Sequence, residues 1–171
     1  MKILLGAIAV LALTACSETN PRYHSRPVFD VDDVAWSTAP GRNSVRGTAV
    51  HKTLARSSRT CASLPVRLVP DSSYARLRFH ELYGSEEAGE STGPNFNAYG
   101  PERSDPRYLN VARVANCDSQ GNFSFEGIPD GTWYVLSTDN SRSQHGANPP
   151  GSALFKRIQL KDGQAADVTL P

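Results

Sequence analysis

The stretch Asn116-Cys-Asp-Ser-Gln-Gly-Asn-Phe-Ser-Phe-Glu-Gly-Ile-Pro-Asp-Gly-Thr-Trp-Tyr-Val-Leu136 decides the fold. It begins with a tight turn, because Asp118 can accept a hydrogen bond from the backbone two residues on and Gly121 tolerates the positive φ that closes such a turn. Phe123 and Phe125 then alternate with polar residues, so both rings point to one face of a strand. This pattern predicts a hydrophobic core on that face.

A second break follows this strand. Pro129 cannot donate to a strand ladder, and Gly131 suits an unusual backbone dihedral. The chain then resumes in the strand-forming residues Thr132-Trp-Tyr-Val-Leu136. The whole stretch therefore predicts a turn, a strand, a second turn and another strand, and it offers no reactive group.

The N-terminus has the pattern of an export signal. Lys2 precedes the apolar run 3–13, which is too short to span a bilayer but fits a signal-peptide core. Residues Leu13-Thr-Ala-Cys16 resemble the lipobox of bacterial lipoproteins, which implies that residues 1–15 are removed and that Cys16 carries the two or more acyl chains of a stable membrane anchor. Ser17, in place of an Asp, favours the outer membrane, with the domain facing the periplasm. The alternative is an ordinary secretory signal that leaves Cys16 free.

Residues 16–41 are expected to form a lipidated, disordered tether, because they carry Pro21, Pro27 and Pro40 among scattered charges. Within this tether the residues from Val28 to Trp36 fit neither the helical nor the strand period, so they are expected to be a loop. Trp36 could still dock on the domain.

Residues 42–171 are predicted to form one domain. Its first strand is expected at 44–52, where Gly47 marks a bulge or a close approach of two backbones. In a second strand, at 64–69, Val66 and Leu68 are expected to face the core. Further strands are expected at 108–114, 152–160 and 166–170, the last two joined by a hairpin-type turn at Asp162-Gly163.

The segments between these strands are less regular. Residues 74–83 fit either a short helix or an extended arm, and long polar loops are expected at 84–107 and 139–151. About seven short strands without a long amphipathic helix predict an all-β fold, a single antiparallel sandwich of the transthyretin-like or Ig-like type.

Several groups of residues along this domain match a known pattern. They are Gly47-Thr-Ala49, Thr60-Cys-Ala62, Val66-Arg-Leu-Val-Pro70 with Tyr74, Cys117 to Phe125, and Pro129 to Tyr134. Together they resemble the carboxypeptidase regulatory-like domain over most of residues 45–170. The resemblance implies a transthyretin-like β-sandwich that acts as a non-catalytic module. The insertion at 85–106 is not part of the family core.

The three cysteines divide into one lipidation site and one pair. If Cys16 carries lipid, Cys61 and Cys117 remain, and an exported protein meets oxidising conditions. We therefore predict a disulfide between Cys61 and Cys117, which would stabilise the fold by about 4 kcal/mol in the chain-entropy model. A metal or redox pair is the alternative, but the sequence has no Cys-x-x-Cys.

Charge and motifs point away from several functions. The formal net charge of +1 implies no bulk attraction to nucleic acid or anionic lipid. The basic residues near the first strand fit a solvated face, or contact with lipid head groups, cell-wall glycan or an acidic partner. His24, His51, His80 and His145 have no metal-ligand spacing and are expected at the surface. No nucleophile elbow or phosphate-binding glycine loop is present. We therefore expect no metal or other cofactor and no catalytic residues, although Glu86, Glu87 and Glu90 beside His80-Glu81 could bind a cation.

Two functions from different classes remain. The first is a non-catalytic envelope lipoprotein that binds a protein or a cell-envelope polymer, with a loop that carries aromatic and amide side chains as the candidate contact. The residues of this candidate loop are Asn95, Phe96, Asn97, Tyr99 and Tyr108. The second is an envelope hydrolase whose site is assembled from residues that are far apart in the sequence.

Overall fold

The structure is a computed structural model that describes residues 27–52, 58–92, 104–139 and 152–171. Within these residues the fold is mostly β, as the sequence predicts, with ten strands in three sheets. The strands are β1 (Asn43–Thr48), β2 (Val50–Lys52), β3 (Ser58–Thr60), β4 (Pro65–Pro70), β5 (Ala88–Thr92), β6 (Arg113–Asn116), β7 (Asn122–Ile128), β8 (Gly131–Asp139), β9 (Ser152–Leu160) and β10 (Ala165–Thr169). The helical segments are the 3-10 helix η1 (Asp32–Thr38) and the α-helices α1 (Ser73–Tyr83) and α3 (Pro106–Asn110). No helix among the described residues is both long and apolar enough to cross a membrane.

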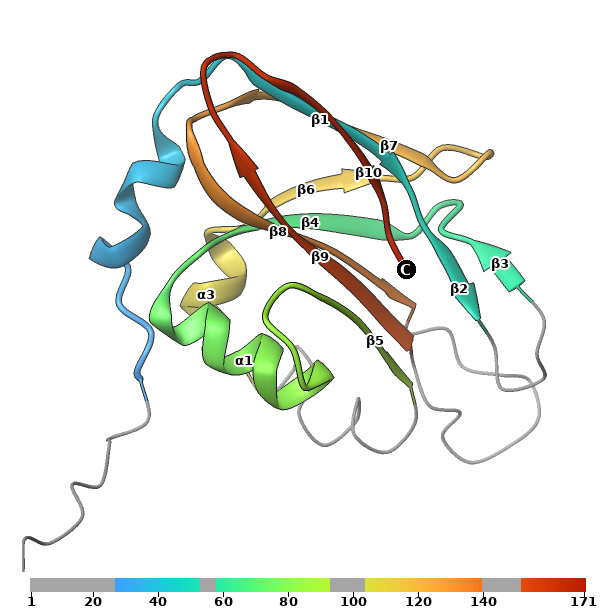
Figure 1. The fold of residues 1–171 in the computed structure, drawn as a ribbon, viewed down its shortest axis with the longest axis horizontal. Helices are drawn as coiled ribbons and strands as arrows, with labels where there is room; N and C mark the ends of the chain where they lie inside the picture. Colours follow the sequence, from blue (N-terminus) through green and yellow to red (C-terminus); the bar gives the residue numbers. More distant parts are fainter. Residues whose placement is uncertain (1–26, 53–57, 93–103, 140–151) are drawn as a thin grey trace, which may run out of the picture.

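Two of the sheets enclose the main core (Figure 1). One has three strands in the order β10-β1-β7, and the other has five in the order β5-β9-β8-β4-β6. The third sheet is the short pair β2-β3. The expected first strand at 44–52 is thus two strands, β1 and β2, which Ala49 separates and which belong to different sheets.

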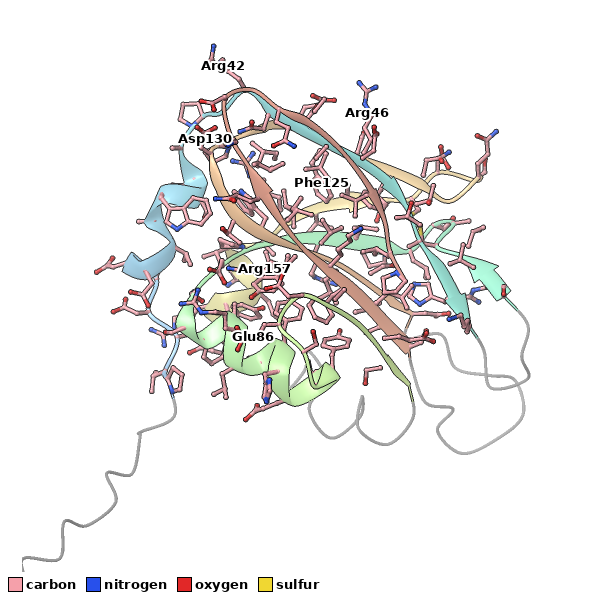
Figure 2. The ribbon with its side chains drawn as sticks, in the orientation of Figure 1. Arg42, Arg46, Glu86, Phe125, Asp130 and Arg157 are labelled. Carbon is pink, nitrogen blue, oxygen red and sulfur yellow. A yellow bond between two sulfur atoms is a disulfide. The ribbon has the colours of Figure 1, made fainter. Side chains whose placement is uncertain are left out.

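The central stretch forms the two strands that its pattern predicts. On β7 the side chains of Phe123 and Phe125 are buried, with ring centroids 6.2 Å apart, whereas Ser124 between them is exposed. Val66 and Leu68 of β4 and Trp133 of β8 meet these rings from the five-stranded sheet. Figure 2 shows Phe125 in the space between the sheets and Arg46 pointing outward into solvent. The alternation therefore places the core as expected.

The helix α1 covers the other face of the five-stranded sheet. Ser72 caps its N-terminus by accepting a hydrogen bond from the Ala75 amide, and Gly84 ends it in the left-handed conformation. Of the two expected conformations for this segment, the structure has the helix. Phe79 stacks on Tyr134 of β8 with ring centroids 4.0 Å apart, so a second apolar cluster forms beneath α1. This layer explains why β8 is buried on both faces.

The expected antiparallel hairpin between the last two strands is wrong. The turn at Asp162 and Gly163 is present, with φ of 59° and 75°, but β10 does not pair with β9. Both edges of β9 are already taken by β8 and β5, so no edge remains for β10. β10 instead crosses to the three-stranded sheet and pairs with the free edge of β1 in parallel. The fold is therefore neither wholly antiparallel nor limited to about seven strands.

Segment 27–41 is not a loop throughout. Residues 32–38 form η1, and Phe29 and Val34 are buried, at 2% and 1% exposed. Trp36 packs edge-to-face on Trp133, with ring centroids 5.0 Å apart. A single short 3-10 segment spans too few residues to show a sequence period, which explains why the pattern missed it.

Two further expectations in the middle of the chain need correction. The predicted loop at 84–107 contains β5, which pairs with β9. The predicted strand at 108–114 is the end of α3 followed by β6. The side chain of Asp105 accepts from the Arg107 amide, and Pro106 occupies the first helical turn, so this segment starts as a helix.

The predicted disulfide between Cys61 and Cys117 is confirmed, with a Cα–Cα distance of 5.8 Å. Cys61 lies between β3 and β4, and Cys117 directly follows β6. The bond therefore ties the start of β4 to the turn that leads into β7.

Candidate functional site

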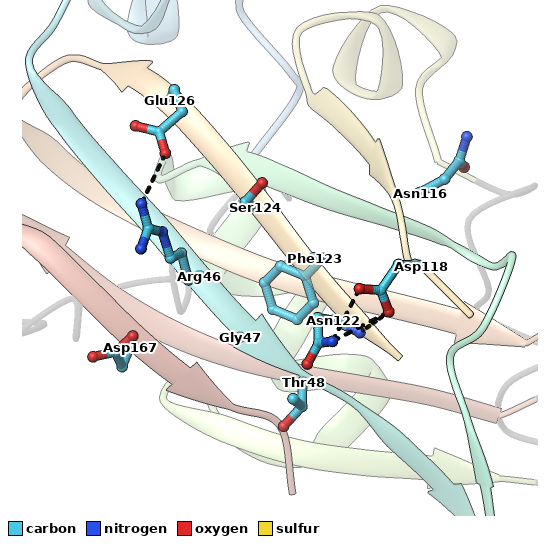
Figure 3. A pocket seen from close by; sticks show the side chains of 10 residues that line it. All are labelled: Arg46, Gly47, Thr48, Asn116, Asp118, Asn122, Phe123, Ser124, Glu126 and Asp167. Carbon is cyan, nitrogen blue, oxygen red and sulfur yellow. Dashed lines mark hydrogen bonds and ion pairs between the residues drawn. The ribbon is translucent and has the colours of Figure 1, made fainter. Parts of the chain in front are cut away.

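A polar groove of about 700 Å³ lies on the outer face of the three-stranded sheet (Figure 3). It is an open depression rather than an enclosed cavity. The lining residues are Arg46, Gly47, Thr48, Asn116, Asp118, Asn122, Phe123, Ser124, Glu126 and Asp167. Guanidinium, amide, hydroxyl and carboxylate groups thus share one surface.

The strand pairing brings these side chains together. Arg46 of β1 is the register partner of Ser124 on β7 and of Asp167 on β10. Neighbouring strands lie about 4.8 Å apart, and side chains of register partners share a face. The next outward position on β1, Thr48, pairs with Asn122 in the same way. The groove is therefore the polar counterpart of the Phe123 and Phe125 face.

Gly47 has a separate role between the strands. A Cβ at this position would collide with the Val168 carbonyl of β10 and would lie 2.6 Å from the Phe123 ring. The close backbone approach predicted at Gly47 is thus confirmed. Without a side chain here, β1 can lie close to β10 over the Phe123 ring.

The turn at Asp118 forms one end of the groove. One carboxylate oxygen of Asp118 accepts from the backbone amides of Gln120 and Asn122, at 2.8 and 2.9 Å, and the other accepts from Asn122 Nδ2 at 2.9 Å. These hydrogen bonds lower the pKa of Asp118, and the bond from the Asn122 side chain has the largest effect. The carboxylate therefore stays charged at neutral pH. Gly121 closes the turn with φ of +87°, as the sequence predicts.

The remaining charges of the groove are loosely held. Arg46 Nη2 lies 3.7 Å from Glu126 Oε1, and their side chains are 70% and 66% exposed, so this ion pair contributes little to stability. The side chain of Asp167 makes no hydrogen bond or ion pair with any residue in the described ranges. These side chains are free to reorient towards a ligand.

A second polar cluster is buried where β2, β8 and β9 meet. His51 Nδ1 lies 2.8 Å from Ser152 Oγ, and His51 Nε2 lies 2.9 Å from Ser137 Oγ. His51 is 1% exposed, so the expectation of a surface histidine is wrong. Each hydroxyl can donate or accept, so either neutral tautomer is satisfied. No sequence pattern predicts this cluster, because both serines are far from His51 along the chain.

The burial of His51 predicts a dependence of stability on pH. Desolvation lowers the pKa of His51 below its ordinary value of 6.5. The negative charge of Asp139 partly opposes this shift, Arg59 adds to it and Glu90 opposes it. The unfolded chain therefore takes up a proton at higher pH than the folded chain, so the free energy of unfolding falls as pH drops through about 6.5 and levels off below the folded pKa. Thermal denaturation of His51→Gln between about pH 7.5 and pH 5 should show a smaller change in Tm than the parent chain. An equal change in both would contradict this role of His51.

The structure separates the other candidate residues. Asn95, Phe96, Asn97, Tyr99 and the lipidation candidate Cys16 lie outside the described residues. Tyr108 is described and is only 5% exposed, with its ring against Phe29 and Tyr74, so it packs the second cluster instead of facing a partner. Glu87 pairs with Arg157 and Glu90 with Lys52, and no cluster with a metal-binding composition occurs within the described ranges.

No protein-family model and no curated protein sequence matches the chain. Among solved structures, the fold is similar to the crystal structure of a "putative carbohydrate binding protein" from Pseudomonas aeruginosa, with a TM-score of 0.63 and 23% sequence identity. The match covers 84% of this chain and 97% of that one. At this identity the likeness establishes a shared fold over nearly the whole of the other protein.

Proposed function

We propose that this chain is a non-catalytic, lipid-anchored envelope protein, with a carboxypeptidase regulatory-like domain that binds a carbohydrate polymer in the polar groove. The observation that carries the proposal is the set of outward donors and acceptors on three adjacent strands around Arg46, Ser124 and Asp167. Sugar hydroxyls both donate and accept hydrogen bonds, so a mixed surface of this kind suits them. The name of the Pseudomonas aeruginosa protein supports the same class of ligand.

An open groove also suits a polymer better than a small molecule. Small-molecule sites are usually enclosed and mostly apolar, whereas this groove is open and most of the described residues that line it are polar or charged. A chain of sugars can lie across the sheet and make several weak contacts at once. The sum of such contacts gives useful affinity without a deep pocket.

Among the described residues, one contact supports the alternative of an envelope hydrolase. The 2.9 Å distance between Ser137 Oγ and His51 Nε2 is that of a nucleophile and its general base. However, Ser137 is 0% exposed and His51 is 1% exposed, so a substrate carbonyl or glycosidic bond has no approach to the hydroxyl. The cluster fits a structural role, and binding is the preferred function.

A bulky side chain placed in the groove tests whether the groove binds the ligand. Ser124 is exposed at the centre of the groove, so Ser124→Tyr should lower the affinity of the full-length chain in detergent for its bound polysaccharide by about tenfold, equivalent to ~1.4 kcal/mol. The probe is a panel of immobilised neutral, N-acetylated, amino and uronic oligosaccharides. Gln159→Tyr, an exposed position on β9 outside the groove lining, is the matched control and should bind normally. Binding that survives Ser124→Tyr would place the ligand elsewhere.

The anchor is tested separately. Cys16→Ser should move the protein from the membrane fraction to the soluble fraction, because the chain would lose its acyl groups. Fractionation of cells followed by immunodetection gives the result. Unchanged partition into membranes would refute lipid anchoring while leaving the proposed binding intact.

A further inference from the structure

We infer that the groove selects glycans that carry free, protonated amino groups, such as polymers of N-deacetylated amino sugars. This inference rests on the proposed function and names the chemistry of its ligand. The lining of the groove includes three carboxylates, on Asp118, Glu126 and Asp167, and one guanidinium, on Arg46. The described residues of the lining therefore carry a formal charge of −2.

The three carboxylates contribute in different ways. The hydrogen-bonding capacity of Asp118 is largely used by its own turn, but its lowered pKa keeps its negative charge at the end of the groove. Glu126 shares Arg46 in a weak pair at 3.7 Å, which a ligand can open. The Asp167 carboxylate has no polar partner within the described residues, so it is available for a strong charge-assisted hydrogen bond.

The position of Asp167 decides how an amine would bind. Asp167 lies directly across β1 from Ser124, because both are register partners of Arg46. Arg46 nevertheless extends towards Glu126, as Figure 3 shows, and Asp167, which also lines the groove, has no counter-ion among the described residues. An ammonium group has three donors and no acceptor, so a carboxylate beside hydroxyl acceptors meets its requirements.

The same charges disfavour an acidic polymer. A uronate would bring its carboxylate within reach of three like charges, which Arg46 only partly offsets. An N-acetylated sugar is neutral and lacks the interaction with Asp167. The groove should therefore rank an amino glycan first, its N-acetylated form second and a uronate last.

The experiment compares three oligosaccharides of equal length with the full-length chain in detergent. The probes are a glucosamine oligomer, its N-acetylated counterpart and a uronate oligomer, measured by calorimetry at low ionic strength. We expect the glucosamine oligomer to bind about tenfold more tightly than the N-acetylated one. This ratio should shrink with added salt and as rising pH removes the protons from the amines.

Two substitutions in the groove should change this ratio in opposite directions. Asp167→Asn should lower the preference for the amine about fivefold, and Arg46→Gln should raise it, because each changes the charge that the amine meets. Asp33→Asn removes an exposed carboxylate on η1, outside the groove, and should leave the ratio unchanged. A merely structural effect of the groove substitutions would move both affinities together.

Each result bears on the inference. Equal affinity for the amine and its N-acetylated form, or preference for the uronate, would overturn the inference but keep carbohydrate binding. Failure of all three probes and of the wider panel would overturn both. Opposite shifts of the ratio in Asp167→Asn and Arg46→Gln would establish it.

Discussion

Replacement of both Cys61 and Cys117 by serine is expected to lower the free energy of unfolding by about 4 kcal/mol. The disulfide closes a loop with a sequence separation of 56 residues, so its loss restores conformational freedom mainly to the unfolded chain. Urea denaturation of the purified chain, followed by intrinsic fluorescence, measures the change. Because small domains have a total stability of only about 5–15 kcal/mol, the loss would be a large fraction of it.

The disulfide should also affect the groove. Cys117 lies between Asn116 and Asp118, both of which line the groove, and the bond fixes this segment to the start of β4. Glycan affinity should therefore fall in the double variant even under conditions where the domain stays folded. The parent chain in strong reductant should match the double variant and is the control. Equal urea midpoints for the oxidised parent and the variant would contradict the assignment.

Patterns of near neighbours in the sequence predicted the centre of the fold correctly. The alternation around Phe123 and Phe125 identified the strand, its buried face and the turn at Asp118. Strand period and turn chemistry depend on residues that are close in sequence, so one stretch contains the whole signal. The disulfide could also be predicted, because lipidation of Cys16 would leave only Cys61 and Cys117 in an oxidising compartment.

The pairing of distant strands could not be read in this way. Asp162 and Gly163 have the composition of a hairpin turn. β10 nevertheless pairs with β1, because both edges of β9 are occupied by β5 and β8. Segment 27–41 lacks a period because its packing depends on single anchors such as Trp36. Tertiary contacts of this kind override local propensity.

The candidate site illustrates the same limit. Asn122, Ser124 and Glu126 were visible as the polar face of a strand, but nothing in the sequence placed Arg46 and Asp167 beside them. A site on three strands needs the sheet order before its residues can be grouped. Attention to aromatic residues in a loop led instead to Tyr108, which packs the core beneath α1.

Trp133→Ala is expected to lower the free energy of unfolding by about 3–5 kcal/mol, as for other fully buried large side chains. Trp133 is 0% exposed, and its Nε1 donates to the Pro129 carbonyl at 3.4 Å. Its ring also holds segment 27–41, because Trp36 packs against it and the Arg113 guanidinium lies 5.9 Å from its centroid. Arg113 in turn donates to the Ser37 carbonyl at 3.1 Å, which fixes the end of η1.

A double-mutant cycle with Trp36→Ala separates the two roles of this ring. Because Trp36 is only partly buried, Trp36→Ala should lower the free energy of unfolding less than Trp133→Ala does. The coupling energy between the two substitutions should be about 0.5–1.5 kcal/mol, the value of an edge-to-face aromatic pair. Urea denaturation of the parent chain, the two single variants and the double variant gives the four free energies of unfolding that the cycle needs. Because both rings join one core, segment 27–41 should unfold together with the sheets in a single transition of the parent chain. A coupling of zero, or separate early release of this segment, would show that η1 rests on the domain without stabilising it.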